Sequence, residues 1–263
     1  MPLDDPIAQP ELSIVIPAYN EAERVGPSLA TIAAHVAHRG ATVEVLLVDD
    51  GSTDDTQAAA RAAAARLGLR FSVLRCTPNR GKGFAVRAGM RAARGRAVLF
   101  TDVDLSVPIS HLDRFESRLA TGDADVVIGS RHAPGAQIVR HQPAARERLG
   151  TIFRDLARTF VAPGISDFTC GFKIFRRDAA QVVFALQRLS GWGFDVEILL
   201  IAHRLGLRVV EEPVEWTNDA RTRVRLGRDV LRSALDLARI RWNDLRGRYR
   251  MPRSVERSAP DCS

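Results

Sequence analysis

The chain has 263 residues, of which 46% are hydrophobic, so it is long enough for one large α/β domain with a small appendage. No uncharged apolar run reaches the roughly 18–20 residues that span a bilayer, and the acidic, proline-bearing start is unlike a signal peptide. The formal net charge of +7 favours an anionic partner, such as nucleic acid, anionic lipid or a phosphorylated ligand, without choosing among them.

Over the first half of the chain, short apolar runs rich in β-branched residues alternate with segments of helical periodicity. The predicted strands are Leu12–Pro17, Val43–Val48, Phe71–Arg75, Ala97–Thr101 and Asp125–Gly129. The helices between them are predicted to end near His38, Gly68 and Gly95. This alternation predicts βαβ units and a largely parallel sheet, in which ligands bind outside the carboxyl ends of the strands.

The second half of the chain has a less regular pattern. The predicted elements are a loop over 132–145, a helix over 146–161, a turn, strand and helix start over 167–180, an amphipathic helix over 192–206, a strand over 207–216 and a basic helix over 229–250. The expected organisation is a flexible N-terminus at 1–10, a main domain at 11–225, an amphipathic helical segment at 226–250 and a disordered tail at 251–263.

Two carboxylates one residue apart, Asp102 and Asp104, follow the fourth predicted strand. In an extended segment, residues i and i+2 point to the same side, so both side chains can face one ligand. Carboxylate oxygens suit a hard divalent cation such as Mg²⁺ or Mn²⁺. The pair therefore indicates a metal site, with a solvated turn at a strand end as the alternative.

Polar residues follow other predicted strands in the same way. Asp49 and Asp50 come after the second strand and offer acceptors for a base or ribose, although a turn with a helix cap explains part of this stretch. Residues 79–83, "NRGKG", open a helix with two glycines and two cations, a composition that suits an anion. Arg131 follows the fifth strand and can bind a phosphate as a fork, or be plain surface charge.

Eight stretches occur in this order along the chain: "SIVIPAYNEAERV", "VLLVDDGSTDDT", "NRGKGFAVRAGM", "VLFTDVDLS", "VIGSR", "DFTCGFKIFRRD", "WGFDVEIL" and "EEPVEWT". Together they resemble the inverting GT-A glycosyltransferases of family 2. Within that family they are most similar to the polyprenyl-phosphate sugar synthases, especially those of the dolichyl-phosphate β-glucosyltransferase type. The resemblance covers roughly residues 11–240 and implies a mixed, largely parallel, Rossmann-like GT-A sheet in a catalytic domain at 11–225.

The resemblance also implies roles for individual residues. A nucleoside-diphosphate sugar would contact residues that follow the strands: Pro17, Tyr19, Glu21, Asp50, Gly81, Lys82, Asp102 and Val103. Asp104 would be the main ligand of Mg²⁺ or Mn²⁺, together with Asp102. Ser106 stands where mannose synthases often have a glutamine, and would be a weaker third ligand or hold a water. The diphosphate or the acceptor phosphate would contact Arg131, Arg148 and Arg223.

The implied reaction is an in-line displacement at the anomeric carbon, from an α-linked donor to a β-linked lipid-phosphate sugar. UDP-glucose is the expected donor and a polyprenyl phosphate the expected acceptor, both by resemblance. A phosphate monoester is largely ionised near pH 7, so it needs cations more than a base. Asp195 and Glu197 lie where relatives have a catalytic acid pair. We expect them to position Lys173 or an arginine, and helix capping is the alternative.

The basic helix predicted at 229–250 offers a route to a membrane. It would carry an apolar stripe beside its basic face, a pattern typical of an interfacial helix, although packing on the core or in a homodimer is the alternative. The expected location is cytoplasmic, peripheral on the cytoplasmic face of a membrane. The stripe consists of Val230, Leu231, Ala234, Leu235, Leu237, Ala238 and Trp242.

Two other functions compete with the lipid-linked transferase. One is a family 2 glycosyltransferase that acts on a saccharide, small-molecule or protein acceptor without a lipid. The other is a basic nucleic-acid-binding domain without enzymatic activity. The low aromatic content of 6% and the absence of a nucleic-acid-binding motif argue against the latter, so no nucleic-acid partner is expected.

Overall fold

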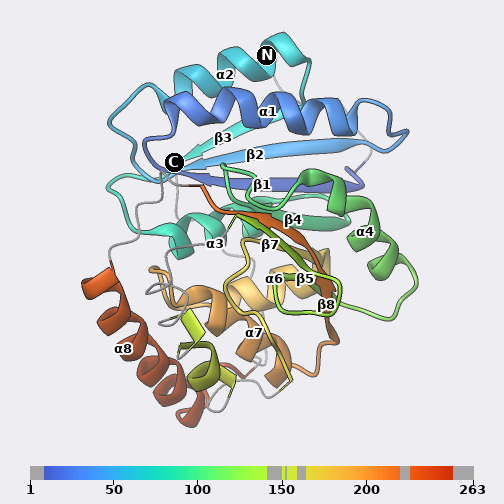
Figure 1. The fold of residues 1–263 in the computed structure, drawn as a ribbon. Coiled ribbons are helices and arrows are strands. Elements are labelled where there is room, and N and C mark those ends of the chain that lie inside the picture. The colour runs from blue at the N-terminus through green and yellow to red at the C-terminus, as the bar shows by residue number, and fades with distance from the viewer. Residues whose placement is uncertain (1–8, 141–149, 152, 159–163, 220–225, 251–263) are drawn as a thin grey trace.

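The computed structural model describes residues 9–140, 150–151, 153–158, 164–219 and 226–250. A seven-stranded sheet with helices on both faces forms the body of the molecule (Figure 1). Its strand order is β3-β2-β1-β4-β7-β5-β8, and only β7 runs antiparallel to its neighbours. The strands are β1 Leu12–Ala18, β2 Val43–Asp49, β3 Phe71–Arg75, β4 Ala97–Thr101, β5 Val126–Ser130, β7 Phe172–Arg176 and β8 Val209–Pro213. The predicted mixed, largely parallel sheet is confirmed.

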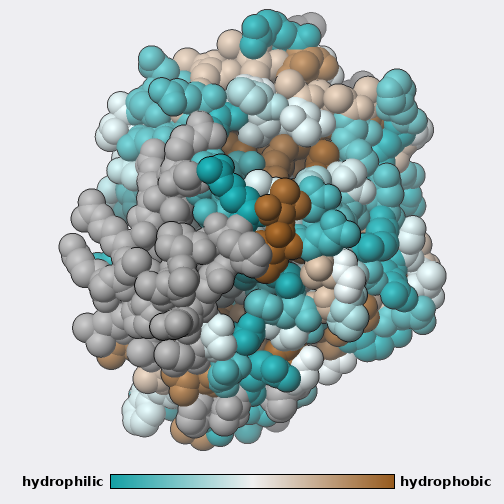
Figure 2. All heavy atoms as spheres, in the orientation of Figure 1, coloured by the Kyte–Doolittle hydropathy of each residue, from teal (hydrophilic) through white to brown (hydrophobic). Residues whose placement is uncertain are grey.

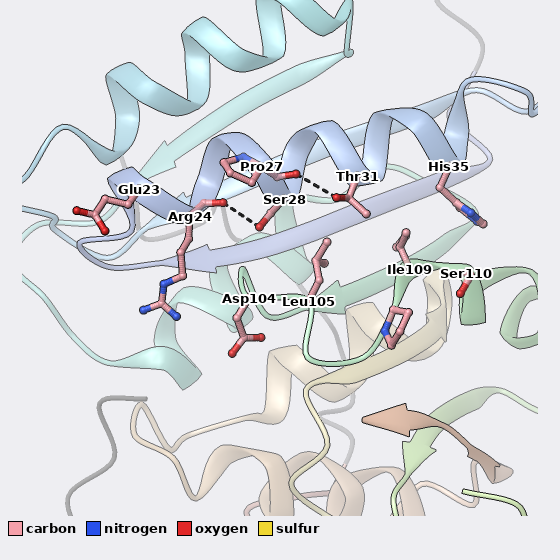
Figure 3. A pocket seen from close by; sticks show the side chains of 11 residues that line it. Glu23, Arg24, Pro27, Ser28, Thr31, His35, Asp104, Leu105, Ile109 and Ser110 are labelled. Atoms are coloured by element: carbon pink, nitrogen blue, oxygen red, sulfur yellow. Dashed lines mark hydrogen bonds between the residues drawn. The ribbon is translucent and has the colours of Figure 1, made fainter. Parts of the chain in front are cut away.

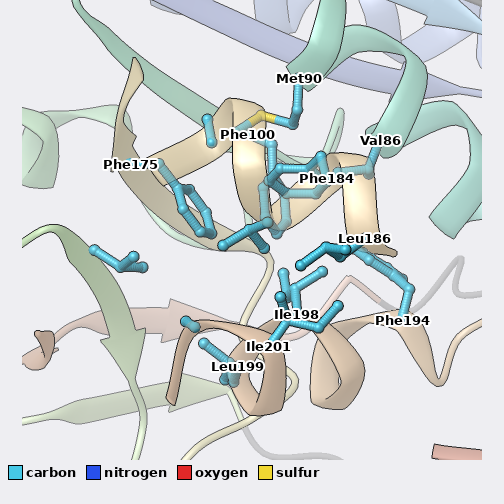
Figure 4. Close-up of a cluster of buried hydrophobic side chains, with 14 of the residues drawn as sticks. Val86, Met90, Phe100, Phe175, Phe184, Leu186, Phe194, Ile198, Leu199 and Ile201 are labelled. Carbon is cyan, nitrogen blue, oxygen red and sulfur yellow. The ribbon is translucent and has the colours of Figure 1, made fainter. Parts of the chain in front are cut away.

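Helices cover both faces of the sheet and create two cores. One face carries α1 Ala22–Val36, α2 Thr56–Leu67, the short helix η1 Ile109–His111 and α4 Leu112–Ala120. The other carries α3 Lys82–Ala92, α6 Arg177–Leu186 and α7 Phe194–Arg204, whose side chains meet in the cluster of Figure 4. In β1, Ile14 and Ile16 belong to the first core and Val15 to the second. Burial on both faces explains why the strands read as continuous apolar runs.

Two elements differ from the sequence prediction because they depend on long-range pairing. A loop was predicted at 132–145, but β6 Gln137–Arg140 lies there and pairs in parallel with β9 Glu215–Thr217. The single strand predicted at 207–216 is divided into β8 and β9. The division falls at Val214, directly after Pro213, which lacks an N–H that could donate to a neighbouring strand.

Helix α7 is buried rather than amphipathic. Every residue from Phe194 to Ala202 is buried, including the acids Asp195 and Glu197. The predicted amphipathic pattern is therefore wrong for this stretch, because its two acidic side chains are buried together with the apolar ones.

Helix α8, Leu226–Leu245, lies at the periphery of the molecule (Figure 1). It ends five residues before the predicted position, and Gly247 with φ +67° follows within a turn. No helix among the described residues is long and apolar enough to cross a membrane. Side chains are described for Arg232 and for residues 235–250 of this region, so Val230, Leu231 and Ala234 of the predicted stripe lie outside the described side chains.

The described part of α8 has two different apolar faces. Leu237 and Ile240 are buried in the core beside α7, whereas Leu235 and Trp242 are more than half exposed. The predicted stripe therefore mixed two faces: Leu237 packs inward, and Leu235, Ala238 and Trp242 lie on the outward side. The helix both packs on the core and presents an apolar surface.

Candidate active site

The parallel strands β1, β2 and β4 end at the same edge of the sheet. Ala18 is paired with Asp49 at the ends of β1 and β2, and Val15 is paired with Phe100 near the end of β4. The loops that follow these strands carry six of the predicted site residues, so the fold brings them to one edge. They are Tyr19, Glu21, Asp50, Asp102, Val103 and Asp104, with Pro17 buried in β1 itself.

Hydrogen bonds fix the loop after β1 against the loop after β2. The N–H of Asn20 donates to Ser52 Oγ at 2.8 Å, and Asn20 has a φ of +55°, a conformation that asparagine tolerates. The Glu21 carboxylate pairs with Arg24 Nε at 2.7 Å on the first turn of α1. Tyr19 is 38% exposed beside them, so its ring is available at the edge of the site.

The glycine-bearing segment before α3 is held by Asp50. The carboxylate of Asp50 accepts the N–H groups of Arg80 at 2.9 Å and Gly81 at 2.7 Å. Burial raises the pKa of Asp50, although these two bonds oppose the shift. The sequence predicted an external anion for this segment, but two of its N–H groups already bind the protein's own carboxylate. Gly81 has φ +103°, and a Cβ there would lie 2.6 Å from the carbonyl oxygen of Ser190.

Lys82 and Asp102 form an ion pair at the carboxyl end of β4. Lys82 Nζ lies 2.6 Å from Asp102 Oδ1, and the side chains are 14% and 33% exposed. Burial disfavours the ammonium, but the carboxylates of Asp102 and Asp195 outweigh it and raise the pKa of Lys82. The Asp102 carboxylate lies directly over Gly171, where any Cβ would collide with it. The glycine of the "TCGFK" stretch therefore makes room for this acid.

Asp104 lies two residues further along the same loop. Its carboxylate accepts the N–H of Ser106 at 3.0 Å and also a hydrogen bond from the Ser106 side chain. Burial, followed by the nearby charge of Asp102, raises the pKa of Asp104. Ser106 thus orients Asp104, and its predicted role as a weaker third metal ligand or as the holder of a water stays a prediction. Val103, between the acids, is 6% exposed, and its carbonyl accepts the hydroxyl of Ser28.

Asp104 also borders open space. A groove of about 570 Å³ separates α1 from the loop at 104–110, with Asp104 and Arg24 near one end and His35 near the other (Figure 3). On the side of the molecule seen in Figure 2, the described surface is mainly hydrophilic, with a small hydrophobic group near its centre. A ligand can therefore reach the carboxylate of Asp104 from this groove.

The donor chemistry of Asp102 and Asp104 fits Mg²⁺ or Mn²⁺. Among the described residues no group of three or more His, Cys, Asp or Glu side chains could enclose an ion. Mg²⁺ needs no such enclosure, because it is commonly bound by one or two carboxylates together with substrate phosphates and water. Burial and the charge of Asp102 raise the pKa of Asp104, and a cation bound there would favour its ionised form.

A second charged pair lies behind the first. Lys173 Nζ is 2.6 Å from Asp195 Oδ1 and also donates to the carbonyl of Cys170 at 2.6 Å, and both charged side chains are almost fully buried. The contact with Lys173 that was predicted for Asp195 is present. Burial raises the pKa of Asp195, against the opposing effect of Lys173 and Lys82.

Glu197, on the same helix as Asp195, has hydrogen-bond partners outside this pair. Its carboxylate accepts the N–H groups of Arg188 at 3.0 Å and Leu189 at 2.8 Å, and the hydroxyl of Tyr249 at 2.7 Å. It therefore anchors the segment before α7 and the end of the α8 region. Burial is the largest influence on the carboxyl group of Glu197 and raises its pKa. Of the two predicted acids, only Asp195 contacts Lys173.

Arg131 is held by Asp167. Its Nε and Nη2 atoms bind the two carboxylate oxygens of Asp167 at 2.7 and 2.8 Å, and Nη2 also reaches Thr169 Oγ1 at 2.7 Å. The guanidinium lies 5.3 Å from the ring centroid of Trp216. The guanidinium was predicted to bind a phosphate as a fork, but its edge formed by Nε and Nη2 already binds the protein's own Asp167. Arg148 and Arg223 lie outside the described residues.

Sequence reasoning missed three residues that shape this site. Asp167 gives no local signal, because its role depends on Arg131 from another element. Gly171 and Trp192 both lie in quoted stretches, but neither was assigned a contact. Lys82 Nζ lies 5.2 Å from the ring centroid of Trp192, which borders the ion pair with Asp102. Charge spacing identified the acids but not their surroundings.

Comparisons with known proteins agree with this arrangement. Residues 13–184 match the family model described as Glycosyl transferase family 2. A dolichyl-phosphate beta-glucosyltransferase of Drosophila melanogaster is 37% identical over 222 residues, 79% of this chain and 67% of that protein. One of Saccharomyces cerevisiae is 35% identical over 246 residues, 88% of this chain and 74% of that protein.

A solved structure shares the fold. It is a glucosyl-3-phosphoglycerate synthase from Mycobacterium tuberculosis in complex with Mn²⁺, uridine-diphosphate-glucose and phosphoglyceric acid. It is 23% identical, with a TM-score of 0.62, and the match covers 93% of this chain and 82% of that one.

Proposed function

Because the chain belongs to glycosyl transferase family 2, we propose that it transfers glucose from UDP-glucose to a polyprenyl phosphate of the dolichyl type, with inversion at the anomeric carbon. The relatives named above are dolichyl-phosphate beta-glucosyltransferases at 35–37% identity, which supports both the sugar and the acceptor. The resemblance seen in the sequence is thereby confirmed at the level of the family, and the GT-A fold by the solved structure.

The observation that carries this proposal is the cluster of Lys82, Asp102 and Asp104 at the carboxyl end of β4. The Lys82 ammonium lies 2.6 Å from the Asp102 carboxylate, and both charges act on the carboxylate of Asp104, two residues further along the same loop. A nucleoside diphosphate needs both kinds of group, since its phosphates bind cations and its metal binds carboxylates. We assign the nucleoside to the β1 and β2 loops, near Tyr19 and Glu21.

Asp102 and Asp104 would hold Mg²⁺ or Mn²⁺, and Mn²⁺ is present in the solved structure described above. When bound, the metal would stabilise the negative charge that develops on the departing diphosphate. Lys82 adds a fixed positive charge beside Asp102. Ser106 keeps the Asp104 carboxylate in one orientation through two hydrogen bonds.

The acceptor phosphate requires no carboxylate to remove a proton, because it is largely ionised near neutral pH. The buried ion pair of Asp195 with Lys173 supports a positioning role for this acid rather than that of a base. Arg131 is pre-oriented by Asp167 and can present its remaining N–H group to a phosphate. Arg148 and Arg223 remain proposed phosphate contacts.

The outer face of α8 suits an anionic membrane surface, where a polyprenyl phosphate would reside. Residues 226–250 contain seven arginines and three aspartates, a net charge of +4 in a chain whose total is +7. The side of the helix that faces away from the core carries three exposed apolar side chains, Leu235 (51%), Trp242 (54%) and Leu245 (68%). An exposed apolar row among cations is typical of a helix that lies on anionic lipid.

A transfer assay with separate donor and acceptor panels tests the proposal. The protein is incubated with Mg²⁺ or Mn²⁺ and UDP-, GDP- or dTDP-linked hexoses, with and without a polyprenyl phosphate. We expect a glucosyl lipid phosphate only when both UDP-glucose and the lipid phosphate are present. Transfer to a saccharide or protein without lipid would support the soluble alternative, and no transfer to lipid from any donor would refute the proposal.

A further inference from the structure

The turn at 187–193, between α6 and α7, covers the N-terminus of α3. The N–H of Phe84 donates to the carbonyl of Ser190 at 3.2 Å, and Gln187 Nε2 donates to the carbonyl of Gly83 at 2.8 Å. A Cβ on Gly83 would lie 2.7 Å from the Cβ of Phe194 and 2.8 Å from two carbonyl oxygens of the turn. The glycines of "NRGKG" therefore allow this turn to lie directly against the site.

Trp192 is at the exposed side of this turn. Its side chain is 50% exposed, and Lys82 Nζ, which binds Asp102, lies 5.2 Å from the ring centroid. Exposure of half of an indole leaves a large apolar surface without a protein partner. The ring therefore lies beside the Lys82–Asp102 pair, where the donor is proposed to bind.

Asp236 of α8 holds the turn from the other side. Its carboxylate accepts the N–H of Gly193, the residue that precedes α7. Gly193 has no side chain that could cap the helix, so the acid on α8 supplies an acceptor and a negative charge at the α7 N-terminus. The contact is tight, since a Cβ on Gly193 would lie 2.6 Å from the Cβ of Asp236. The side chain of Asp236 is 13% exposed, and Arg239 is its ion-pair partner at 3.3 Å.

We propose that Trp192 forms a wall of the donor-sugar site and that Asp236 is the residue that positions this wall. The inference rests on the proposed function, because it assigns the ligand at Lys82 and Asp102 as a nucleoside-diphosphate sugar. The indole packs against the apolar C–H face of the hexose and makes no contact with the nucleoside. It therefore contributes to binding of UDP-glucose but not of UDP. Asp236 acts only through the turn, so its loss has the same signature.

Calorimetric titration with UDP and with UDP-glucose, each in the presence of Mn²⁺, separates these effects. We expect Trp192→Ala to bind UDP like the wild type and UDP-glucose about five- to tenfold more weakly, and Trp192→Phe to retain most of the affinity. Asp236→Ala should show the same pattern. Asp244→Ala is the matched control, because it removes an acid from the same helix that pairs with Arg204 and not with the turn.

Equal weakening of UDP and UDP-glucose binding in Trp192→Ala would overturn the wall assignment, and unchanged binding of both would do the same. For Asp236, hydrogen exchange of the 189–197 peptide gives a reading that needs no ligand. Exchange should accelerate in Asp236→Ala and stay at the wild-type rate in Asp244→Ala, and an unchanged rate in Asp236→Ala would refute the positioning role. A wild-type protein that binds neither ligand would instead refute the proposed donor, while the exchange result still decides the role of Asp236.

Discussion

Single residues at this site carry charges that the protein stabilises only in part. Asp102 has Lys82 as its partner, whereas Asp104 has hydrogen bonds from Ser106 and the repulsion of Asp102. A group whose pKa is raised in the folded state favours folding at low pH and disfavours it once it ionises. The folded chain therefore accepts the charge of Asp104 at a cost in stability, as expected for a residue kept for binding.

Replacement of Asp104 should separate activity from stability. We expect Asp104→Asn to lower the transfer rate at least a hundredfold, because the cation loses a carboxylate ligand. The negative charge that develops on the diphosphate is then less well stabilised. The variant's melting temperature at pH 7 should not fall, since the neutral amide removes the repulsion with Asp102. Full activity in Asp104→Asn would contradict the metal assignment.

Variants of the buried pair of Lys173 and Asp195 test whether Asp195 serves stability or acts as a base. Asp195→Ala leaves a buried, uncompensated ammonium and should lower the free energy of unfolding by about 3–5 kcal/mol, measured by urea denaturation. Glu11→Ala, which removes an exposed partner of Arg96, should change it by less than about 1 kcal/mol. The double variant Lys173→Met, Asp195→Leu should regain much of the stability. If Asp195 only positions Lys173, its loss should leave the acidic limb of the pH–rate profile unchanged, that is, the fall in activity as the pH is lowered. Disappearance of that limb would indicate a base.

At the scale of elements, the structure joins segments that are distant in sequence. Asp167, before β7, fixes Arg131 at the end of β5, and Glu211 of β8 accepts the N–H groups of Ser166 and Asp167 at 2.8 and 2.9 Å. Local sequence predicts the strands themselves, because apolar runs report burial. It does not predict that β7 runs antiparallel or that β6 pairs with β9, since those facts depend on which segments meet in space.

The Asp167–Arg131 pair should appear in the acid stability of the fold. Burial disfavours the carboxylate, but Arg131 outweighs it and holds the pKa of Asp167 at about 2. The unfolded chain takes up this proton near pH 4, so stability present above pH 4 is lost as the pH falls toward 2. We expect Asp167→Asn to be less stable than the wild type at pH 7 and to show a shallower loss between pH 4 and 2, measured by urea midpoints. Parallel curves would contradict this assignment.

The residues of the candidate site could be predicted where they directly follow the ends of parallel strands. Asp102, Asp104 and Asp50 were identified from spacing, because parallel strands bring their carboxyl ends together whatever the details of packing. The internal partners of Asp50 and Arg131 could not be predicted. Asp50 accepts hydrogen bonds from two backbone N–H groups, and Arg131 binds an acid that is distant in sequence. The turn with Trp192 escaped notice for the same reason, as its position depends on α8.

On the scale of the whole molecule, α8 connects the active site to the outer surface. Its inner face contributes Leu237 and Ile240 to the core and Asp236 to the turn beside α3. Its outer face carries Leu235 and Trp242 among arginines. A polyprenyl phosphate has its charged group at a lipid surface, so an enzyme that acts on it gains from a face that holds it there. The arrangement predicts membrane binding that needs both charge and exposed apolar area.

Vesicle sedimentation tests this outer face without any acceptor lipid. Wild-type protein should bind vesicles of phosphatidylcholine with 30% phosphatidylglycerol, bind pure phosphatidylcholine weakly, and lose most binding in 0.5 M NaCl, because salt screens the arginines. Trp242→Glu should reduce binding about tenfold, since it removes an exposed indole that would insert into the lipid surface and adds a repulsive charge. Leu67→Glu makes the same kind of change on α2, at a side chain 38% exposed on a different element, and should bind like the wild type. If Trp242→Glu bound as the wild type does, or if both variants lost binding equally, the membrane would have to meet another face of the molecule.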